Sequence, residues 1–364
     1  MGTCRRESHD GVVRQGDLLT ATRPDLTGTI AQTIISKLAL SRISIAISLL
    51  IVAIAVFTLY ELLRDVDFGK LVAAMQAQSI RKLAIAGAFV VAGYITLTFY
   101  DLFALRTIGR NTVPYSVAAL ASFTSSAIGH NLGAAVLTSG LVRLRIYSLW
   151  GLTVVDIAKI AFVTGMTFWL GNALLLGGAM TYAPESASAV DHLPAWINRM
   201  IGLAGLLSIA CYLIWLAPRP RVVGRSYWRI VLPNLRLTLL QIGIGALDLG
   251  LVALAMCALL PPSPPSPAVD FAAVLVIFLI ATLLGTVSHA PGSLGVIEAA
   301  VLIGLPQFGK EELLAALLTF RVLYFVIPLL FATLVLGLRE LHLVARRATG
   351  RRVHPARNLV RRTG

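Results

Sequence analysis

Long apolar stretches alternate with short polar segments along most of the chain, and this pattern predicts membrane-spanning helices. About 20 apolar residues suffice to cross the hydrocarbon core of a bilayer. We expect six full crossings, at 43–63, 83–105, 152–180, 200–216, 237–260 and 313–338. The chain is therefore predicted to be an all-α polytopic membrane protein.

Two further apolar segments are interrupted by glycines, a histidine and charge. Segment 115–147 is rich in serine, threonine and glycine and includes His130, Asn131, Ser139, Gly140, Arg143 and Arg145. Segment 271–305 includes His289, Pro291, Gly292, Gly295 and Glu298. Irregular polar backbone at membrane depth is tolerated only where it packs against protein or lines a water-filled cavity. These segments are therefore expected to form re-entrant helical hairpins rather than spans.

Loop charges predict the topology. Segment 219–236 carries five arginines and no acid, and the tail from 339 carries eight arginines and one glutamate, so both are expected in the cytoplasm. Segments 182–198 and 261–270 contain acids but no lysine or arginine and are expected outside. The number of crossings between these loops requires one hairpin to enter from each side. Both termini are then cytoplasmic, and the basic pair at 81–82 is the one exception to the charge rule.

The two hairpins predict an inverted repeat. A shift of 155 positions places Gly140 on Gly295 and Arg143 on Glu298. If both hairpins reach the membrane centre, Arg143 and Glu298 could neutralise one another. Broken helices that meet near the midplane in inverted repeats are typical of secondary transporters. The expected organisation is a polar cytoplasmic tail at 1–42, a membrane domain at 43–338 with repeats at about 83–180 and 237–338, and a basic cytoplasmic tail at 339–364.

Composition supports the membrane and argues against other classes. Hydrophobic residues make up 57% of the chain and charged residues 13%, with a mean hydropathy of +0.83, against about 25% charged residues in soluble domains. The net charge of +14 lies mostly at the edges of apolar segments, which does not indicate nucleic-acid binding. The three cysteines are scattered, and neither His130 nor His289 has a companion at metal-ligand spacing. No metal or cofactor is expected.

Charges inside the spans are candidates for a binding site. Asp248 lies in the middle of span 237–260, where an unpaired carboxylate costs at least about 2.5 kcal/mol. The alternative for Asp248 is a structural pair with a neighbouring helix. Asp156 and Lys159 could simply pair with each other on one helix face. Arg143 and Arg145 suit phosphate geometry, with interface anchoring as the alternative.

Three blocks of sequence carry a family resemblance. Residues 123–152, 288–298 and 320–324, the last containing Arg321 and Tyr324, resemble the transmembrane region of bacterial lysylphosphatidylglycerol synthase/flippase proteins, the multiple peptide resistance factors. The similarity extends over about 40–343. In that family the membrane region moves aminoacylated phosphatidylglycerol between leaflets, a property linked to resistance to cationic antimicrobial peptides. A separate soluble domain transfers the amino acid from tRNA, and we expect that activity to be absent here.

The resulting hypothesis is a flippase-like protein, not an enzyme, in the bacterial inner membrane. Arg143, Arg145 and Arg321 would hold a lipid phosphate, while Asp248 and Glu298 would face a cationic headgroup such as that of aminoacylated phosphatidylglycerol. Two alternatives stay open: a lipid-modifying membrane enzyme, and a scaffold that partners a separately encoded lipid synthase. The candidate substrate-binding residues are His130, Asn131, Ser139, Gly140, Arg143, Arg145, Asp248, His289, Pro291, Gly292, Gly295, Glu298, Arg321 and Tyr324.

Overall fold

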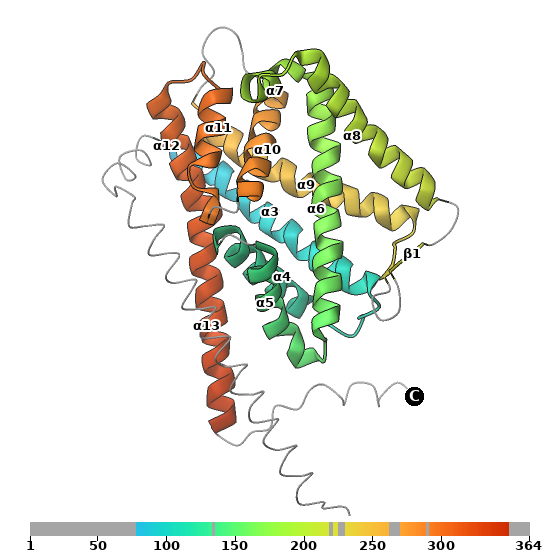
Figure 1. Cartoon of the computed structure of the whole chain (residues 1–364). Coiled ribbons are helices and arrows are strands. Elements are labelled where there is room, and N and C mark those ends of the chain that lie inside the picture. The colour runs from blue at the N-terminus through green and yellow to red at the C-terminus, as the bar shows by residue number, and fades with distance from the viewer. Residues whose placement is uncertain are drawn as a thin grey trace, which may run out of the picture. The chain divides into compact units, whose positions relative to one another are not determined.

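A computed structural model describes residues 78–132, 135–217, 221–224, 230–261, 270–288 and 291–348. This part of the chain is helical apart from one pair of very short strands (Figure 1). The predicted N-terminal tail, the predicted first span at 43–63 and the tail beyond 348 lie outside the described residues.

The elements follow one another with short connections. They are α3 (Ile80–Thr107), α4 (Tyr115–Leu132), α5 (Ala135–Tyr147), η1 (Ser148–Trp150), α6 (Val154–Tyr182), α7 (Pro184–Asp191), α8 (Ala195–Leu216), β1 (Val222–Val223), β2 (Ile230–Val231), α9 (Leu235–Leu259), α10 (Phe271–Ser288), η2 (Pro291–Ser293), α11 (Val296–Gly304), α12 (Lys310–Arg321), η3 (Val322–Val326) and α13 (Ile327–Ala348). The strands are antiparallel, with Val222 opposite Val231. Helices α12 and α13, joined by the π-helical turn η3, contain one continuous apolar stretch over Glu312–Leu343.

Six helices of the described part are long and apolar enough to cross a membrane, which confirms an all-α polytopic architecture. Five of them, α3, α6, α8, α9 and the α12–α13 rod, coincide with predicted spans. The sixth, α10, is the first arm of the predicted second hairpin. Its 18 residues can reach about 27 Å at about 1.5 Å per residue. Length alone therefore allows α10 either to cross or to turn back.

Both interrupted segments fold as helical hairpins. Helices α4 and α5 pack against each other, and α10 packs against α11. The two hairpins lie at opposite ends of the helical bundle, and α4 contacts η2, so their turns meet (Figure 1). Helices α5 and α11, of 13 and 9 residues, are too short to span a bilayer core of about 30 Å. How deep each hairpin enters a membrane stays a prediction.

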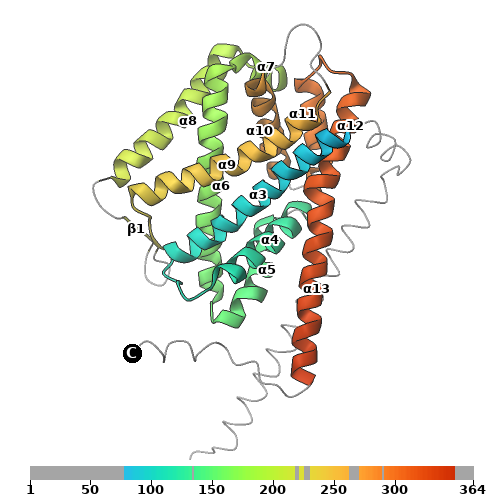
Figure 2. The same cartoon turned by 180° about the vertical axis from the view of Figure 1, so that it is seen from behind.

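The order and spacing of the helices recur along the chain. Helices α3, α4 and α6 begin at Ile80, Tyr115 and Val154, and α9, α10 and α12 begin 155, 156 and 156 positions later. In both views α3 of the first set runs in the opposite direction to α9, its counterpart in the second set (Figures 1 and 2). These boundaries favour the expected inverted repeat, whose symmetry stays a prediction.

The basic pair that breaks the charge rule begins α3 at the end of the bundle where α9 finishes. The Lys82 Nζ donates to the Leu260 carbonyl at 2.7 Å, and the Gln78 amide donates to the Leu259 carbonyl at 3.2 Å. A cation at the C-terminus of a helix stabilises its unpaired carbonyls. Lys82 therefore has a local structural reason to lie on this side.

The central packing depends on glycines and buried amides. Helices α3 and α9 lie side by side and both contact α6 (Figure 2). A Cβ added at Gly245 of α9 would meet the Thr167 carbonyl of α6, and one at Gly171 would meet the backbone of Gly245. The Gln241 amide donates to the Thr167 hydroxyl at 2.9 Å. Small residues and buried polar pairs are the usual means of joining helices in a membrane.

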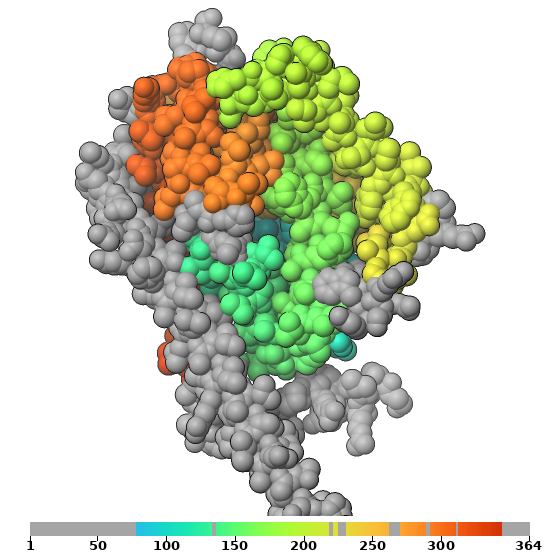
Figure 3. Space-filling view, in the orientation of Figure 1, coloured from blue at the N-terminus to red at the C-terminus, as the bar shows by residue number. Residues whose placement is uncertain are grey.

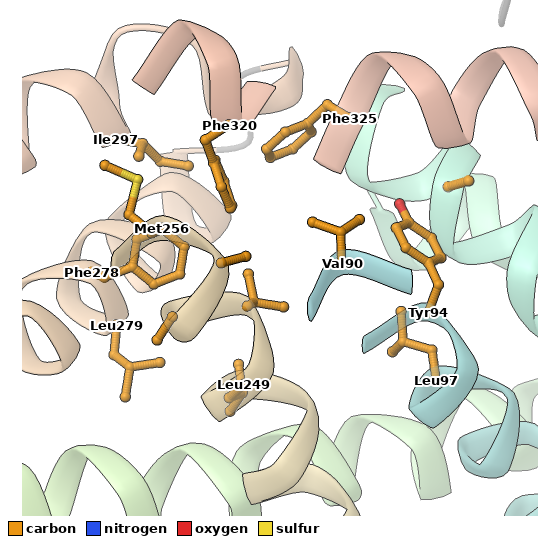
Figure 4. Packing of buried hydrophobic residues seen from close by; sticks show 14 of the residues in the cluster. Val90, Tyr94, Leu97, Leu249, Met256, Phe278, Leu279, Ile297, Phe320 and Phe325 are labelled. Carbon is orange, nitrogen blue, oxygen red and sulfur yellow. The ribbon is translucent and has the colours of Figure 1, made fainter. Parts of the chain in front are cut away.

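Apolar packing surrounds this crossing. Figure 4 shows Phe320 and Phe325 of the α12–η3–α13 rod near Val90 and Tyr94 of α3, with Met256 of α9 on the other side. The rings of Phe320 and Phe278 meet edge to face at 5.4 Å. The rod is thereby fixed against α3 and α10.

We expect Gly245→Val to destabilise the protein by about 1–3 kcal/mol, because the added side chain would force α6 and α9 apart. Thermal unfolding of the detergent-solubilised protein would measure the effect. Gly243→Val is the matched control, because a Cβ at Gly243 meets nothing within 4 Å. Equal unfolding temperatures for the two variants would contradict this account of the crossing.

Candidate functional site

The tip of the first hairpin holds polar groups inside the bundle. Asn131 is buried at the end of α4, and its amide donates to the carbonyls of Ala127 at 2.7 Å and Phe325 at 3.2 Å. The Ser139 hydroxyl of α5 donates to the Ser125 carbonyl of α4 at 2.9 Å. Nδ1 of His130 and Oδ1 of Asn131 are buried without a hydrogen-bond partner among the described residues. Hydrogen bonds therefore hold the tip in place, while two of its buried polar atoms lack a partner among the described residues.

The tip of the second hairpin is built from left-handed backbone. Gly292, Ser293 and Gly295 have φ of 57°, 52° and 78°. Glycine adopts positive φ without strain, which explains why two of these three positions are glycine. Glu298 accepts a hydrogen bond from the Gly295 amide at 2.9 Å and so caps α11. His289 and the side chain of Pro291 lie outside the described residues.

Arg321 holds this second tip closed. Its Nη1 donates to the Gly292 carbonyl at 2.8 Å, its Nη2 to the Ser293 carbonyl at 3.2 Å, and its Nε to Glu298. The guanidinium also lies 5.7 Å from the centre of the Phe325 ring. All three of its nitrogens are engaged by the second tip, and a role of Arg321 in holding a phosphate stays a prediction.

The π-helical turn η3 joins both tips. The Tyr324 ring stacks on His130 with centroids 5.8 Å apart, and the Tyr324 carbonyl accepts a hydrogen bond from the Tyr94 hydroxyl of α3 at 3.0 Å. Short π-helical turns inside α-helices occur often at functional sites. We refer to His130, Asn131, Gly292, Arg321 and Tyr324 as the tip cluster. The structure brings together these five sequence-predicted residues.

Asp248 lies deep in the bundle beside the tip cluster. It is 5% exposed, and its Oδ2 accepts a hydrogen bond from the Tyr100 hydroxyl of α3 at 3.0 Å. A Cβ added at Gly93, the residue before Tyr94 on α3, would lie 3.9 Å from the other carboxylate oxygen, Oδ1. Its Oδ1 has no partner among the described residues. Asp248 therefore has a phenol as its partner, and no described cation forms a salt bridge with it.

Arg143 pairs with a residue that the sequence analysis did not select. Its Nε donates to both carboxylate oxygens of Asp101, at 3.1 and 3.0 Å, and its Nη2 donates to Oδ1 at 2.8 Å. The Tyr147 hydroxyl donates to Asp101 at 2.8 Å. Asp101 is completely buried. The expected neutralisation of Arg143 by Glu298 was wrong, because each has found another partner.

Other predicted residues are also engaged elsewhere. Arg145 pairs with Glu340 of α13 at 2.5 Å, a contact between distant parts of the chain. Asp156 pairs with Arg110 at 2.8 Å and caps α6, so its expected pairing with Lys159 was wrong. Gly140 has open space around it. Arg143 and Arg145 thus have separate acidic partners.

Asp101, Tyr94 and Tyr100 are the residues that sequence reasoning missed. All three lie on α3, where Asp101 follows a long apolar run. An acid at the end of an apolar segment is easily assigned to the membrane surface. The signal that could have found it is the spacing of Tyr94 and Asp101, seven residues or about two helical turns apart on one face.

No metal site is formed in the part of the chain that the structure describes, where no three His, Cys, Asp or Glu side chains gather closely enough to hold an ion. Besides the paired Arg321 and Glu298, the polar groups at the two tips are an imidazole, an amide, a phenol and backbone carbonyls. Such groups can exchange hydrogen bonds with a polar ligand.

Comparison with known proteins places the chain in a family. It is 34% identical over 269 residues to protein slr0712 of Synechocystis, covering 72% of this chain and 82% of that protein. It is 31% identical over 258 residues to inner membrane protein YbhN of Escherichia coli, covering 70% and 79%. No protein-family model matches the chain.

The chain therefore belongs to the family of these YbhN-like inner membrane proteins. Together with the six apolar helices, this relationship supports a multi-pass location in the inner membrane. A shorter match links it to phosphatidylglycerol lysyltransferase of Staphylococcus haemolyticus, 39% identical over 69 residues, covering 18% of this chain and 8% of that protein. This match supports in part the resemblance that the motif blocks indicate.

We expect Asp101→Leu to destabilise the protein by about 3–5 kcal/mol, because it leaves the Arg143 charge buried without a partner. The double variant Asp101→Leu, Arg143→Met should recover most of this loss. Unfolding in increasing fractions of a denaturing detergent would measure both.

Arg110→Gln is the control for loss of an ion pair, because the Arg110 side chain is 44% exposed and its pair should contribute no more than about 1 kcal/mol. A double variant as unstable as Asp101→Leu would argue against the buried charge as the cause.

Proposed function

We propose that this protein moves an anionic phospholipid between the leaflets of the inner membrane by passing the headgroup along the tip cluster. Membership in a family of inner membrane proteins and the partial similarity to phosphatidylglycerol lysyltransferase support a lipid-related role. Phosphatidylglycerol, with or without an attached amino acid, is the cargo class that this similarity suggests.

The observation that carries the proposal is the unsatisfied polarity of the tips. Buried polar groups in proteins nearly always have partners, because an orphaned one costs about 1–3 kcal/mol. Here His130 Nδ1 and Asn131 Oδ1 lack partners among the described residues, in the region where the two hairpins meet. A headgroup with hydroxyl and phosphate oxygens, together with the water around it, would satisfy both atoms.

A route for the headgroup is available on one face. Figure 3 shows this face hollowed between α10, α6 and the α4–α5 hairpin, with blue atoms of α3 at its floor. A headgroup in such a hollow would avoid the hydrocarbon, where a bare charge is prohibitive, while its acyl chains stay in lipid.

The arginines take different roles in this proposal from those first expected. Arg321 and Glu298 keep the second tip folded, and Arg145 ties α5 to α13. In this proposal Arg143 offers its Nη1 to a phosphate, since Nε and Nη2 are the atoms that donate to Asp101. It would then act as a partly neutralised anion site.

Re-entry of both hairpins is part of the proposal. The α5–α6 connection and the end of α13 lie at one end of the bundle, and α7 and the α11–α12 connection lie at the other (Figure 1). Arginines gather at the first end and acids such as Glu185 and Asp191 at the second, which favours a cytoplasmic first end. The α4–α5 hairpin would then enter from the cytoplasm and the α10–α11 hairpin from outside.

Movement rather than chemical turnover is the proposed activity. Incubation of the purified protein with radiolabelled phosphatidylglycerol should return the lipid unchanged on thin-layer chromatography. A new labelled product would favour a lipid-modifying enzyme instead.

Single cysteines would test the topology in a background without native cysteines. Ser116→Cys and Ser148→Cys, at the two ends of the first hairpin, should react with a membrane-impermeant maleimide only from the cytoplasmic side. Asp270→Cys and Gln307→Cys, at the ends of the second, should react only from outside. Labelling of Ser116→Cys and Ser148→Cys from opposite sides would show that the segment spans.

Lipid movement would be tested with protein reconstituted in vesicles that contain fluorescent phosphatidylglycerol, by dithionite bleaching of the outer leaflet. We expect His130→Phe and Tyr324→Phe each to slow exchange on the order of tenfold, the effect of one lost hydrogen bond in the rate-limiting step. Both variants keep the stacked rings.

Tyr115→Phe is the matched control, because Tyr115 lies at the exposed start of α4 and its hydroxyl contacts Thr98. Its exchange rate should equal that of the unmodified protein. Failure of the unmodified protein to exchange lipid above protein-free vesicles would refute the proposed function.

A further inference from the structure

Asp248 differs from the other buried acids of the described chain. Asp101 pairs with Arg143, and Asp156 pairs with Arg110. Asp248, equally buried, forms no salt bridge with any described residue. The partly buried Glu298 and Glu340 also each have an arginine. The protein therefore neutralises its interior carboxylates with arginines at every one of these positions except Asp248.

The polar group in contact with Asp248 is a phenol. Tyr100 of α3 donates a hydrogen bond to its Oδ2, and Tyr94 on the same helix donates to the Tyr324 carbonyl of η3. The remaining carboxylate oxygen, Oδ1, lies beside Gly93 of α3: a Cβ added there would come within 3.9 Å of it. Oδ1 itself has no hydrogen-bond partner among the described residues.

The other helices that pack on α9 bring no cation to Asp248. Helix α10 has no titratable residue at all. On α6, Leu175 lies level with Gly250 of α9, so Asp156 and Lys159 are about 25 Å away along the helix. Arg321 of α12 is engaged by Glu298, and Arg199 of α8 lies in the first turns of that helix.

A carboxylate in such surroundings must be neutralised by a ligand that binds reversibly. An isolated ionised carboxylate is strongly disfavoured in a low-dielectric interior and takes up a proton or a cation instead. A metal ion would need several oxygen ligands around the site. The described residues around Asp248 supply one carboxylate and phenol hydroxyls, which suit a proton.

We propose that Asp248 is the proton-binding site that couples a transmembrane proton gradient to lipid movement. This inference rests on the proposed function. The carboxyl is protonated while the hairpin tips are closed, and it releases the proton to water when the tips open. The Tyr100 hydroxyl keeps its own proton and stabilises the ionised form by its hydrogen bond.

Few residues lie between the proposed proton site at Asp248 and the tip cluster. Tyr94, on the helix that carries Tyr100, donates to the Tyr324 carbonyl, and Tyr324 stacks on His130 in the tip cluster. Tyr100 in turn donates a hydrogen bond to the Asp248 carboxylate. The π-helical turn thus lies between the proton site and the lipid route.

The test uses reconstituted vesicles with an imposed pH gradient and fluorescent phosphatidylglycerol. If one proton moves with each lipid, a gradient of about one pH unit should support a lipid asymmetry of up to about tenfold. Asp248→Asn should abolish this response to the gradient. The control Asp270→Asn, an exposed acid at the start of α10, should keep it.

Each other outcome decides against the proposal. Lipid exchange in the unmodified protein that ignores the pH gradient overturns proton coupling but leaves the proposed function intact. A gradient response that survives in Asp248→Asn overturns the assignment to this residue. If Asp248→Asn keeps the gradient response and loses only the movement of lipids with cationic headgroups, Asp248 is a headgroup ligand.

Proton binding can also be measured without lipid transport. Infrared difference spectra of the purified protein between neutral and alkaline buffer, a range in which exposed carboxylates stay ionised, should contain a carbonyl band from a protonated carboxyl. This band should be absent in Asp248→Asn and present in Asp270→Asn. An unchanged band in Asp248→Asn would overturn the proposal even if no lipid moved. If the unmodified protein fails to exchange lipid but the band is lost in Asp248→Asn, the proposed function is refuted. The assignment of the proton site to Asp248 then still holds.

Discussion

A broken helix inside a membrane must have its freed backbone groups satisfied by protein, and this constraint governs the centre of the molecule. Arg321 provides the clearest case, because one guanidinium reaches two carbonyls of the η2 turn and the Glu298 carboxylate that caps the next helix. Asn131 serves the other hairpin by binding a carbonyl of its own helix and one of η3. Without these contacts the two tips could not lie against each other.

The same requirement separates charges that hold the structure from groups that are open to a ligand. Arg143, Arg145 and Arg321 looked alike as phosphate ligands, yet each has an acidic partner from a different helix. Among the described buried atoms without a hydrogen-bond partner, Nδ1 of His130 and Oδ1 of Asn131 lie at the first tip, and Oδ1 of Asp248 lies on α9. The tips and Asp248 are therefore the groups assigned to the proposed function, and the ion pairs around them hold the helices in position.

The recurrence of helix starts after about 155 residues connects the fold to this arrangement. The expected inverted repeat would bring two hairpins toward one centre from opposite ends, and the contact between α4 and η2 agrees with it. The ion pairs do not follow the repeat, since Arg143 and Glu298 occupy matching positions but bind Asp101 and Arg321. The two halves therefore share the spacing of their helices and differ in the polar contacts that stabilise them.

The sequence by itself determined the class of fold, most of the described spans and the positions of both helix breaks, because length, apolarity and glycine content are local properties that a bilayer reads directly. It also selected His130, Asn131, Arg321 and Tyr324 as special. Only the tertiary structure decided which charges meet, because ion pairs such as Arg143–Asp101 and Arg145–Glu340 join residues 42 and 195 positions apart. Whether a buried charge has a partner depends on helix crossings, and these are fixed by close contacts such as Gly171 with Gly245.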